Sequence, residues 1–183
     1  FHSNFCLEAI YMYTMFKFII ISLITVSFFY GCTSSNNSKK NSELNNIKKP
    51  EDLYIDAMNL FSSENYFFAN EEFIKLQQLY PLSNEAIQAE IMMGFISYLQ
   101  LDYDDAVLKF ERFISKYPSH NNLDYVYYMI AMSYYEQITH HELDGQYNEL
   151  ALISFNQVIT RFPNSEYAKD SRQKIILVKS NKA

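Results

Sequence analysis

The sequence predicts an all-α protein, an α-solenoid of about three helix-turn-helix repeats that follows an apolar N-terminal segment and a flexible tether. Two observations carry this prediction. The 183-residue chain has 49% hydrophobic residues but only three Gly and four Pro, a balance that favours helices over a turn-rich β fold. Three similar sequence segments, each ending in a proline, recur in the last two-thirds of the chain. Repeats of this period are typical of stacked helix pairs.

Residues 1–31 are predicted to be a signal peptide preceded by spurious upstream residues. The chain begins with Phe1, so Met12 or Met15 is a better start. Met15 is followed by Lys17 and then by an apolar run. A run of about a dozen residues fits a secretory signal, whereas a membrane span needs roughly 20 apolar residues.

The apolar run ends in "FYGC", which resembles a bacterial lipobox, with Gly31 directly before Cys32. Phe29 and Tyr30 depart from the usual Leu and small residue of that signal. The resemblance implies that Cys32 carries a covalent lipid and that the chain is cut before it. Several acyl chains on this residue would anchor the protein more stably than one. The alternative is an incidental Cys in an uncleaved anchor. A disulfide is not expected, because Cys6 lies before the predicted start.

Residues 32–50 are predicted to be this lipidated Cys and a flexible linker. The stretch from 33 to 49 reads "TSSNNSKKNSELNNIKK" and holds two aliphatic residues and no aromatic one. Such a segment cannot bury enough apolar surface to fold.

Residues 51–183 are predicted to be the repeat domain. The recurring phrases are "FANEEFIKLQQLYP" (68–81), "YDDAVLKFERFISKYP" (103–118) and "YNELALISFNQVITRFP" (147–163). They divide the domain into units at about 51–84, 86–121 and 123–166, with a final helix at 166–180. The third unit is longer by eight residues within "QITHHELDGQ", which we interpret as an enlarged loop containing Gly145.

Aligned on their prolines, the units share small residues in both helices and one Phe in the second helix. The columns are Ala57, Gly94 and Ala131; Ala69, Ala106 and Ala151; and Phe73, Phe110 and Phe155. This pattern resembles the tetratricopeptide repeat (TPR), in which small residues allow the two helices to approach and the aromatic side chain fills the space beside them. The Trp usual near the start of the TPR is absent, and the unit is longer than the usual one.

The TPR register predicts which side chains of the first helices line a concave surface that binds an extended peptide or a partner loop. They are Tyr54, Met58, Phe61, Ile91, Phe95, Tyr98, Tyr125, Tyr128, Met132 and Tyr135. Aromatic and Met side chains suit apolar partner segments. Lys and Arg, which a carboxylate clamp requires, are missing from this set. The alternative is that several of these residues pack in the core.

Sites for metal, nucleotide or catalysis are not predicted. The adjacent His140 and His141, followed by Glu142, lack the zinc-protease spacing and are interpreted as a polar loop. His120 is expected to shape a turn. The formal net charge of −6, without a basic stripe, argues against nucleic-acid binding. We therefore expect no enzyme activity and no cofactor other than the lipid on Cys32.

Three neighbouring carboxylates open the second phrase, and we interpret them as a helix cap rather than a cation site. Asp102, Asp104 and Asp105 precede a helix expected to begin near Ala106, where carboxylates suit the free amide groups and the helix dipole. The sequence offers neither the glycine nor the distal Glu of a calcium loop.

The repeats and the lipobox together resemble the BamD (ComL/YfiO-type) family of outer-membrane assembly lipoproteins. The segments that carry this resemblance are "LYIDAMNLFSSENYFFANEEFIKLQQLYP", "FERFISKYPSHNNLDYVYYMIAMSYYEQI" and "AKDSRQKIILVK". Family members continue for two more repeats, so we expect this chain to be truncated at its C-terminus.

The resemblance implies a non-enzymatic scaffold of the β-barrel assembly (BAM) complex that helps insert outer-membrane proteins. It implies lipid anchoring at the periplasmic face of the outer membrane, and Thr33 after the lipidated Cys agrees with outer-membrane sorting. The implied partners are BamA, other BAM subunits and unfolded β-barrel proteins. The alternative is another periplasmic TPR protein that coordinates the envelope or cell division, of the CpoB type.

Overall fold

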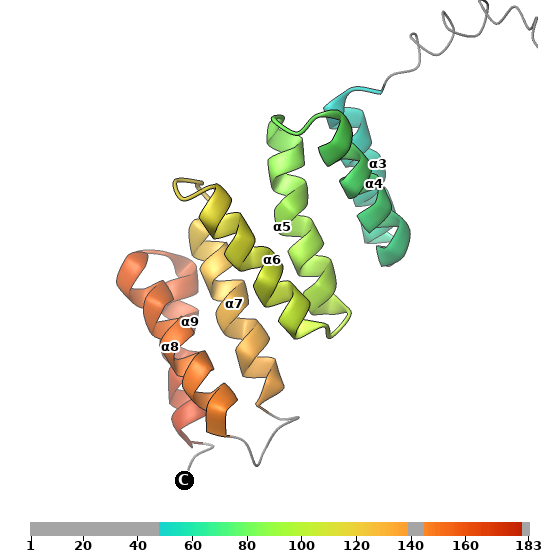
Figure 1. Ribbon diagram of the computed structural model, residues 1–183. Helices are drawn as coiled ribbons and strands as arrows, with labels where there is room; N and C mark the ends of the chain where they lie inside the picture. Colours follow the sequence, from blue (N-terminus) through green and yellow to red (C-terminus); the bar gives the residue numbers. More distant parts are fainter. Residues whose placement is uncertain (1–47, 139–144, 181–183) are drawn as a thin grey trace, which may run out of the picture. The chain divides into compact units, whose positions relative to one another are not determined.

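A computed structural model describes residues 48–138 and 145–180, and these residues form helices joined by short turns, with no strand among them (Figure 1). Cys32, the predicted linker up to residue 47, and the His140–His141 pair lie outside the described residues. The helices are α3 Pro50–Ser62, α4 Tyr66–Leu79, α5 Asn84–Leu99, α6 Tyr103–Lys116, α7 Leu123–Gln137, α8 Gly145–Arg161 and α9 Glu166–Ser180. The predicted all-α solenoid of TPR-like repeats is confirmed.

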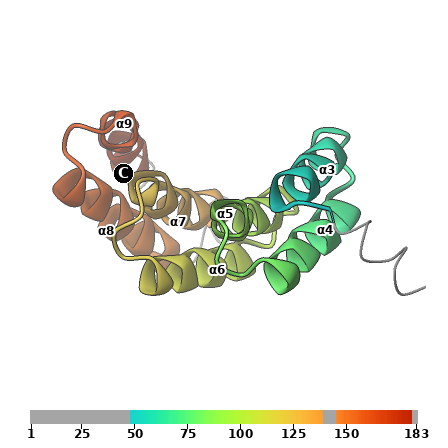
Figure 2. The ribbon, with the colours of Figure 1, turned by 90° about the horizontal axis from the view of Figure 1, so that it is seen from above.

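The helices of the repeat domain form two layers. Viewed along the array, α3, α5, α7 and α9 lie on its inner side, and α4, α6 and α8 lie on its outer side (Figure 2). Each helix contacts the next one in sequence, and α3 with α5, α5 with α7, and α7 with α9 are also in contact. The inner layer is therefore continuous from α3 to α9.

The core lies between the two layers and contains every residue of the three repeat columns. Its members Ala57, Ala69, Phe73, Ala106, Phe110, Ala131, Ala151 and Phe155 are all 0% exposed, and Gly94 is buried with them. A Cβ atom at Gly94 would lie 2.7 Å from Cε1 of Phe110. Only glycine leaves room for this ring, because real Cβ atoms do not approach other atoms so closely.

The helix starts follow local signals, with three differences from the sequence-based expectation. Asp102 accepts a hydrogen bond from the Asp105 backbone N at 3.3 Å, so the capping interpretation is confirmed for Asp102. Because α6 begins at Tyr103 rather than near Ala106, Asp104 and Asp105 lie inside the helix. Gly145, which the sequence assigned to an enlarged loop, lies in α8. Pro50, which the sequence assigned to the linker, is the first residue of α3, a position where Pro is favoured.

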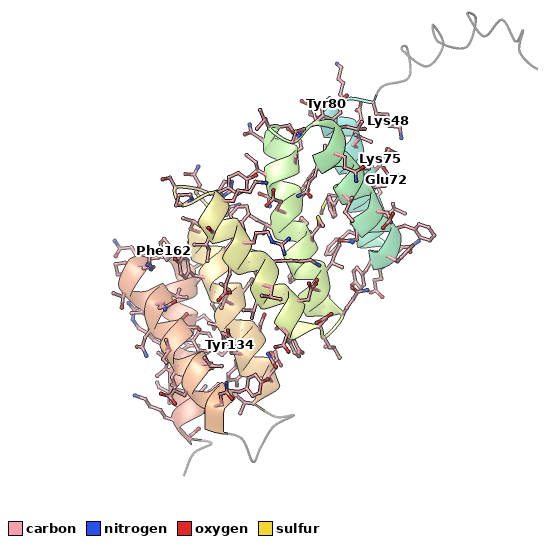
Figure 3. The ribbon with its side chains drawn as sticks, in the orientation of Figure 1. Lys48, Glu72, Lys75, Tyr80, Tyr134 and Phe162 are labelled. Atoms are coloured by element: carbon pink, nitrogen blue, oxygen red, sulfur yellow. The ribbon has the colours of Figure 1, made fainter. Side chains whose placement is uncertain are left out.

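Aromatic residues at the ends of α4 and α6 fasten neighbouring elements. Tyr80 follows α4 and donates its hydroxyl hydrogen to the Lys48 carbonyl oxygen at 2.8 Å, so the end of α4 holds the chain where it enters α3 (Figure 3). Tyr117 follows α6 and donates to Glu90 Oε1 at 3.0 Å. The third aromatic residue before a closing proline, Phe162, packs against Tyr127 of the neighbouring inner helix with the ring centroids 5.6 Å apart (Figure 3).

His120 shapes the turn between α6 and α7, as the sequence predicted. Its Nδ1 accepts a hydrogen bond from the Asn122 backbone N at 3.1 Å, and its ring meets that of Phe113 edge-on, with the centroids 5.1 Å apart. Its own backbone N donates to the Tyr117 carbonyl oxygen. The side chain is thus part of the turn.

Within the described ranges, none of the helices is long and apolar enough to cross a membrane.

Candidate functional site

The inner layer carries a row of half-buried apolar and aromatic side chains, which we call the inner aromatic surface. The nine residues proposed for it from sequence are all partly exposed: Tyr54, Met58, Phe61, Phe95, Tyr98, Tyr125, Tyr128, Met132 and Tyr135. Ile91, the tenth side chain of the register, is 1% exposed and packs in the core, so its assignment to this surface was wrong.

Ring contacts join the first two repeats along this surface. Phe61 of α3 lies 6.0 Å from Phe95 of α5, centroid to centroid. Phe95 stacks on Tyr98 at 6.2 Å with an interplanar angle of 12°. These rings are fixed by their neighbours and still reach solvent, so a partner side chain can contact them with little loss of rotamer entropy.

A second aromatic group lies between α7 and α9. The Tyr167 ring of α9 is 5.5 Å from Tyr125 and 5.2 Å from Tyr128. Burial raises the pKa of Tyr125 above its usual value, and the neighbouring Tyr167 adds to the shift. Sequence reasoning missed Tyr167, because it lies only four residues after Pro163 and no aromatic occupies that place in the other units.

Two carboxylates accept hydrogen bonds from tyrosines of this surface. Tyr98 OH donates to Glu136 Oε1 at 3.4 Å, and Tyr128 OH donates to Asp170 Oδ2 at 2.6 Å. Burial raises the pKa of Tyr98 and of Tyr128, and each carboxylate raises it further. Both phenols therefore stay protonated and remain donors.

Asp170 could have been placed here from sequence. It lies seven residues after Pro163, as Tyr125 lies seven residues after Pro118, so extending the repeat register into the last helix puts both on the same face.

At its α7–α9 end, the inner aromatic surface is bordered by the side-chain cation of Lys174. Lys174 Nζ of α9 lies 4.7 Å from the centroid of the Tyr135 ring, which in turn is 6.1 Å from Phe155. Met132 packs against the same cluster of buried residues. Tyr135 is therefore covered on one side by a charged group, unlike the rings of α3 and α5.

A cavity of about 570 Å³ opens beside the N-terminal half of α5 and shares one lining residue with the inner aromatic surface. Tyr54 belongs to both, and its ring is held against Phe73 at 5.7 Å. The remaining lining comes from the start of α5 and from the turn before α7, and much of it is polar: Asn84, Glu85, Gln88, His120, Asn121 and Asn122. The geometry suits recognition of a polar main chain beside apolar side chains.

Metal chemistry has no candidate ligands in the part of the chain that the structure describes. There, no group of three or more His, Cys, Asp or Glu lies close enough to hold an ion. Asp105, one of the three clustered carboxylates, is instead paired with Lys109 at 2.5 Å and accepts a hydrogen bond from Ser97.

A family model described as an outer membrane lipoprotein, YfiO, matches residues 46–183. The chain belongs to the YfiO family of outer membrane lipoproteins. The match spans the described helices and their inner aromatic surface.

Curated relatives carry one shared name. An outer membrane protein assembly factor BamD of Rickettsia prowazekii is 37% identical over 154 residues, which cover 84% of this chain and 59% of the relative. The protein of that name from Caulobacter vibrioides is 30% identical, with 87% of this chain and 52% of the relative covered. One from Neisseria gonorrhoeae is 26% identical, with coverages of 84% and 62%.

The chain thus spans between half and two-thirds of the length of these relatives. Their names describe assembly factors for outer membrane proteins, and they do not favour the alternative of a CpoB-type coordinator. The family associates the chain, and with it the inner aromatic surface, with the outer membrane.

Proposed function

We propose that this YfiO-family chain is a non-enzymatic lipoprotein scaffold for the assembly of outer-membrane β-barrel proteins. In this role it binds partner or client segments on the inner aromatic surface. The lipid on Cys32 anchors it to the outer membrane at the periplasmic face, and the linker carries the repeats away from the bilayer.

One observation carries the proposal: the nine apolar and aromatic side chains belong to the neighbouring inner helices α3, α5 and α7, and each is half-buried. Side chains that only fill a core are covered completely, as the Phe residues of the repeat columns are. An aromatic surface that is held rigid yet open is suited to capture extended, apolar segments. Unfolded β-barrel proteins expose such segments, since alternate residues of their strands are apolar.

The partners that follow are BamA and the other subunits of the BAM complex, together with unfolded β-barrel clients. The names of the curated relatives support this choice, because each describes an assembly factor for outer membrane proteins. Nucleic acid is not a partner in this proposal, since the charge of the chain is acidic.

A binding experiment with two matched pairs of Phe-to-Ala substitutions tests the proposal. An unfolded β-barrel protein, fluorescently labelled and diluted from urea, is titrated with the full chain in detergent. The variant F61A/F95A removes two rings from the inner aromatic surface. The control F67A/F68A removes two rings from α4 in the outer layer, where Phe67 and Phe68 are 66% and 56% exposed.

We expect the inner variant to weaken binding about tenfold or more, because buried aromatic contacts dominate binding energy. The control variant should bind as the wild type does, and circular dichroism should show that both variants are folded. Equal binding by the wild type and the folded inner variant would remove the surface from the proposed function. A loss confined to the control would move the site to α4.

A further inference from the structure

Three of the four inner helices carry acidic side chains and no basic ones. The inner helices α3, α5 and α7 contain no Lys, Arg or His, and their carboxylates are Glu51, Asp52, Asp56, Glu85, Glu90, Asp124 and Glu136. The cations of the helices lie on α4, α6, α8 and α9. The two carboxylates bonded to tyrosines, Glu136 and Asp170, lie on the inner aromatic surface itself.

The basic side chains of the inner layer lie at its two ends, Lys48 before α3 and Lys169, Arg172, Lys174 and Lys179 on α9. Lys48, just before α3, is paired with Asp56. Lys174 of α9 covers the Tyr135 ring. Between these ends, the helices that line the surface offer an incoming carboxylate no side-chain cation.

The cavity beside α5 adds groups that match a peptide main chain. The side chains of Asn84, Glu85 and Asn121 make no hydrogen bond or ion pair with other described residues. An Asn amide offers both a donor and an acceptor, which are the two functions of a peptide unit. Nδ1 of His120 is occupied as an acceptor, which leaves Nε2 as a donor in the neutral ring.

The starts of α5 and α7 also lie at this cavity, and helix starts attract anions. Each carries a carboxylate in its first turn, Glu85 in α5 and Asp124 in α7, which offsets that attraction. The C-terminal carboxylate of a bound peptide would therefore gain little binding energy from these helix starts.

We propose that the inner aromatic surface and its cavity bind an extended internal segment of an unfolded partner protein that carries Lys or Arg beside its apolar side chains, and that they do not read a free C-terminal carboxylate. The free Asn amides bond the main chain of the segment, its apolar side chains contact the rings, and its cations face the carboxylates. The inference rests on the proposed function and specifies which segments that function selects.

Three synthetic peptides test the inference against the full chain in detergent, by fluorescence anisotropy at low and high salt. All have the same alternating aromatic and aliphatic residues. The first has Lys at the intervening charged positions and an amidated C-terminus, the second has Glu in place of Lys, and the third is the Lys peptide with a free carboxylate. Variant N84A/N121A removes the two free amides, and Q78A/Q157A removes two exposed amides from the outer helices.

We expect the Lys peptide to bind at least tenfold more tightly than the Glu peptide at low salt, with the ratio falling as salt screens the charges. The free carboxylate should give no gain. N84A/N121A should weaken the binding of every peptide several-fold, and Q78A/Q157A should leave the binding unchanged. Equal or tighter binding of the Glu peptide, or a gain of tenfold or more from the free carboxylate, overturns the inference.

The outcomes separate this inference from the function on which it rests. Capture of unfolded β-barrel proteins without any preference among the peptides overturns the charge selection and leaves the scaffold function standing. The expected peptide preference without capture of β-barrel proteins supports the selectivity of the surface and overturns its assignment to barrel assembly.

Discussion

Gly94 lies where α5 packs closely against α6. Its missing side chain lets α5 approach the fully buried Phe110 ring of α6. We expect Gly94→Ala to lower the free energy of unfolding by about 1–2 kcal/mol, because overpacking costs roughly 1–3 kcal/mol and the better helix propensity of Ala returns part of this. Urea denaturation followed by circular dichroism measures the change.

Gly145→Ala is the matched control, since a Cβ at Gly145 meets nothing within 4 Å. Its effect should stay within about 0.5 kcal/mol, as at most surface sites. If both substitutions stabilise the chain equally, the Phe110 ring is free to move and the close approach is not required.

Asp105 makes stability depend on pH. Partial burial of its carboxyl would raise the pKa, but hydrogen bonds from Lys109 and Ser97 and the charges of Lys109 and Arg112 outweigh burial and lower it. The stabilisation is therefore complete above the unfolded value of about 3.9 and is lost as pH falls through the lower folded value.

Asp105→Asn should consequently be less stable than wild type at pH 7, and the difference should shrink below about pH 4. The carboxylate is partly exposed, so we expect a difference of less than about 1 kcal/mol. Urea midpoints at pH 7 and pH 3 give the measurement. A difference that is the same at both pH values would mean that the charge of Asp105 is not involved.

At the scale of elements, helix starts are stabilised unequally. Ser83 caps α5 by accepting a hydrogen bond from the Ala86 backbone N at 3.1 Å, whereas Asn65 at the start of α4 makes no such bond. Ser83→Ala should cost about 1 kcal/mol, and Asn65→Ala should cost less. Thermal unfolding of both variants checks this, and a larger loss for Asn65→Ala would contradict it.

The sequence anticipated the helices and their columns but misplaced some boundaries. The start of α6 at Tyr103 differs from expectation because a helix start depends on which side chain caps the first amides, here that of Asp102. The repeat pattern marks only the buried face. A boundary is a local hydrogen-bonding choice, and several nearby residues can make it.

At the scale of the whole molecule, the proposed anchoring depends on Cys32, which lies outside the described residues. Cells that make the chain are labelled with palmitate, beside cells that make Cys32→Ser, and their membranes are separated. We expect label in the outer-membrane fraction for the wild type and none for the variant, because the acyl chains are attached through this thiol. Label that persists in Cys32→Ser would place the lipid elsewhere, and no label in either would remove the anchor from the proposal.

The sequence by itself determined the solenoid, because small residues and Phe recurring in register mark where helix pairs must pack. It also assigned nine partly exposed side chains to the inner aromatic surface, together with Ile91. Only the tertiary structure decided how far that surface extends, since Tyr167 and Asp170 join it from α9, and that Ile91 leaves it for the core. Register assigns a side chain to a face of its own helix, but exposure depends on how closely the neighbouring helices approach, which no single helix encodes.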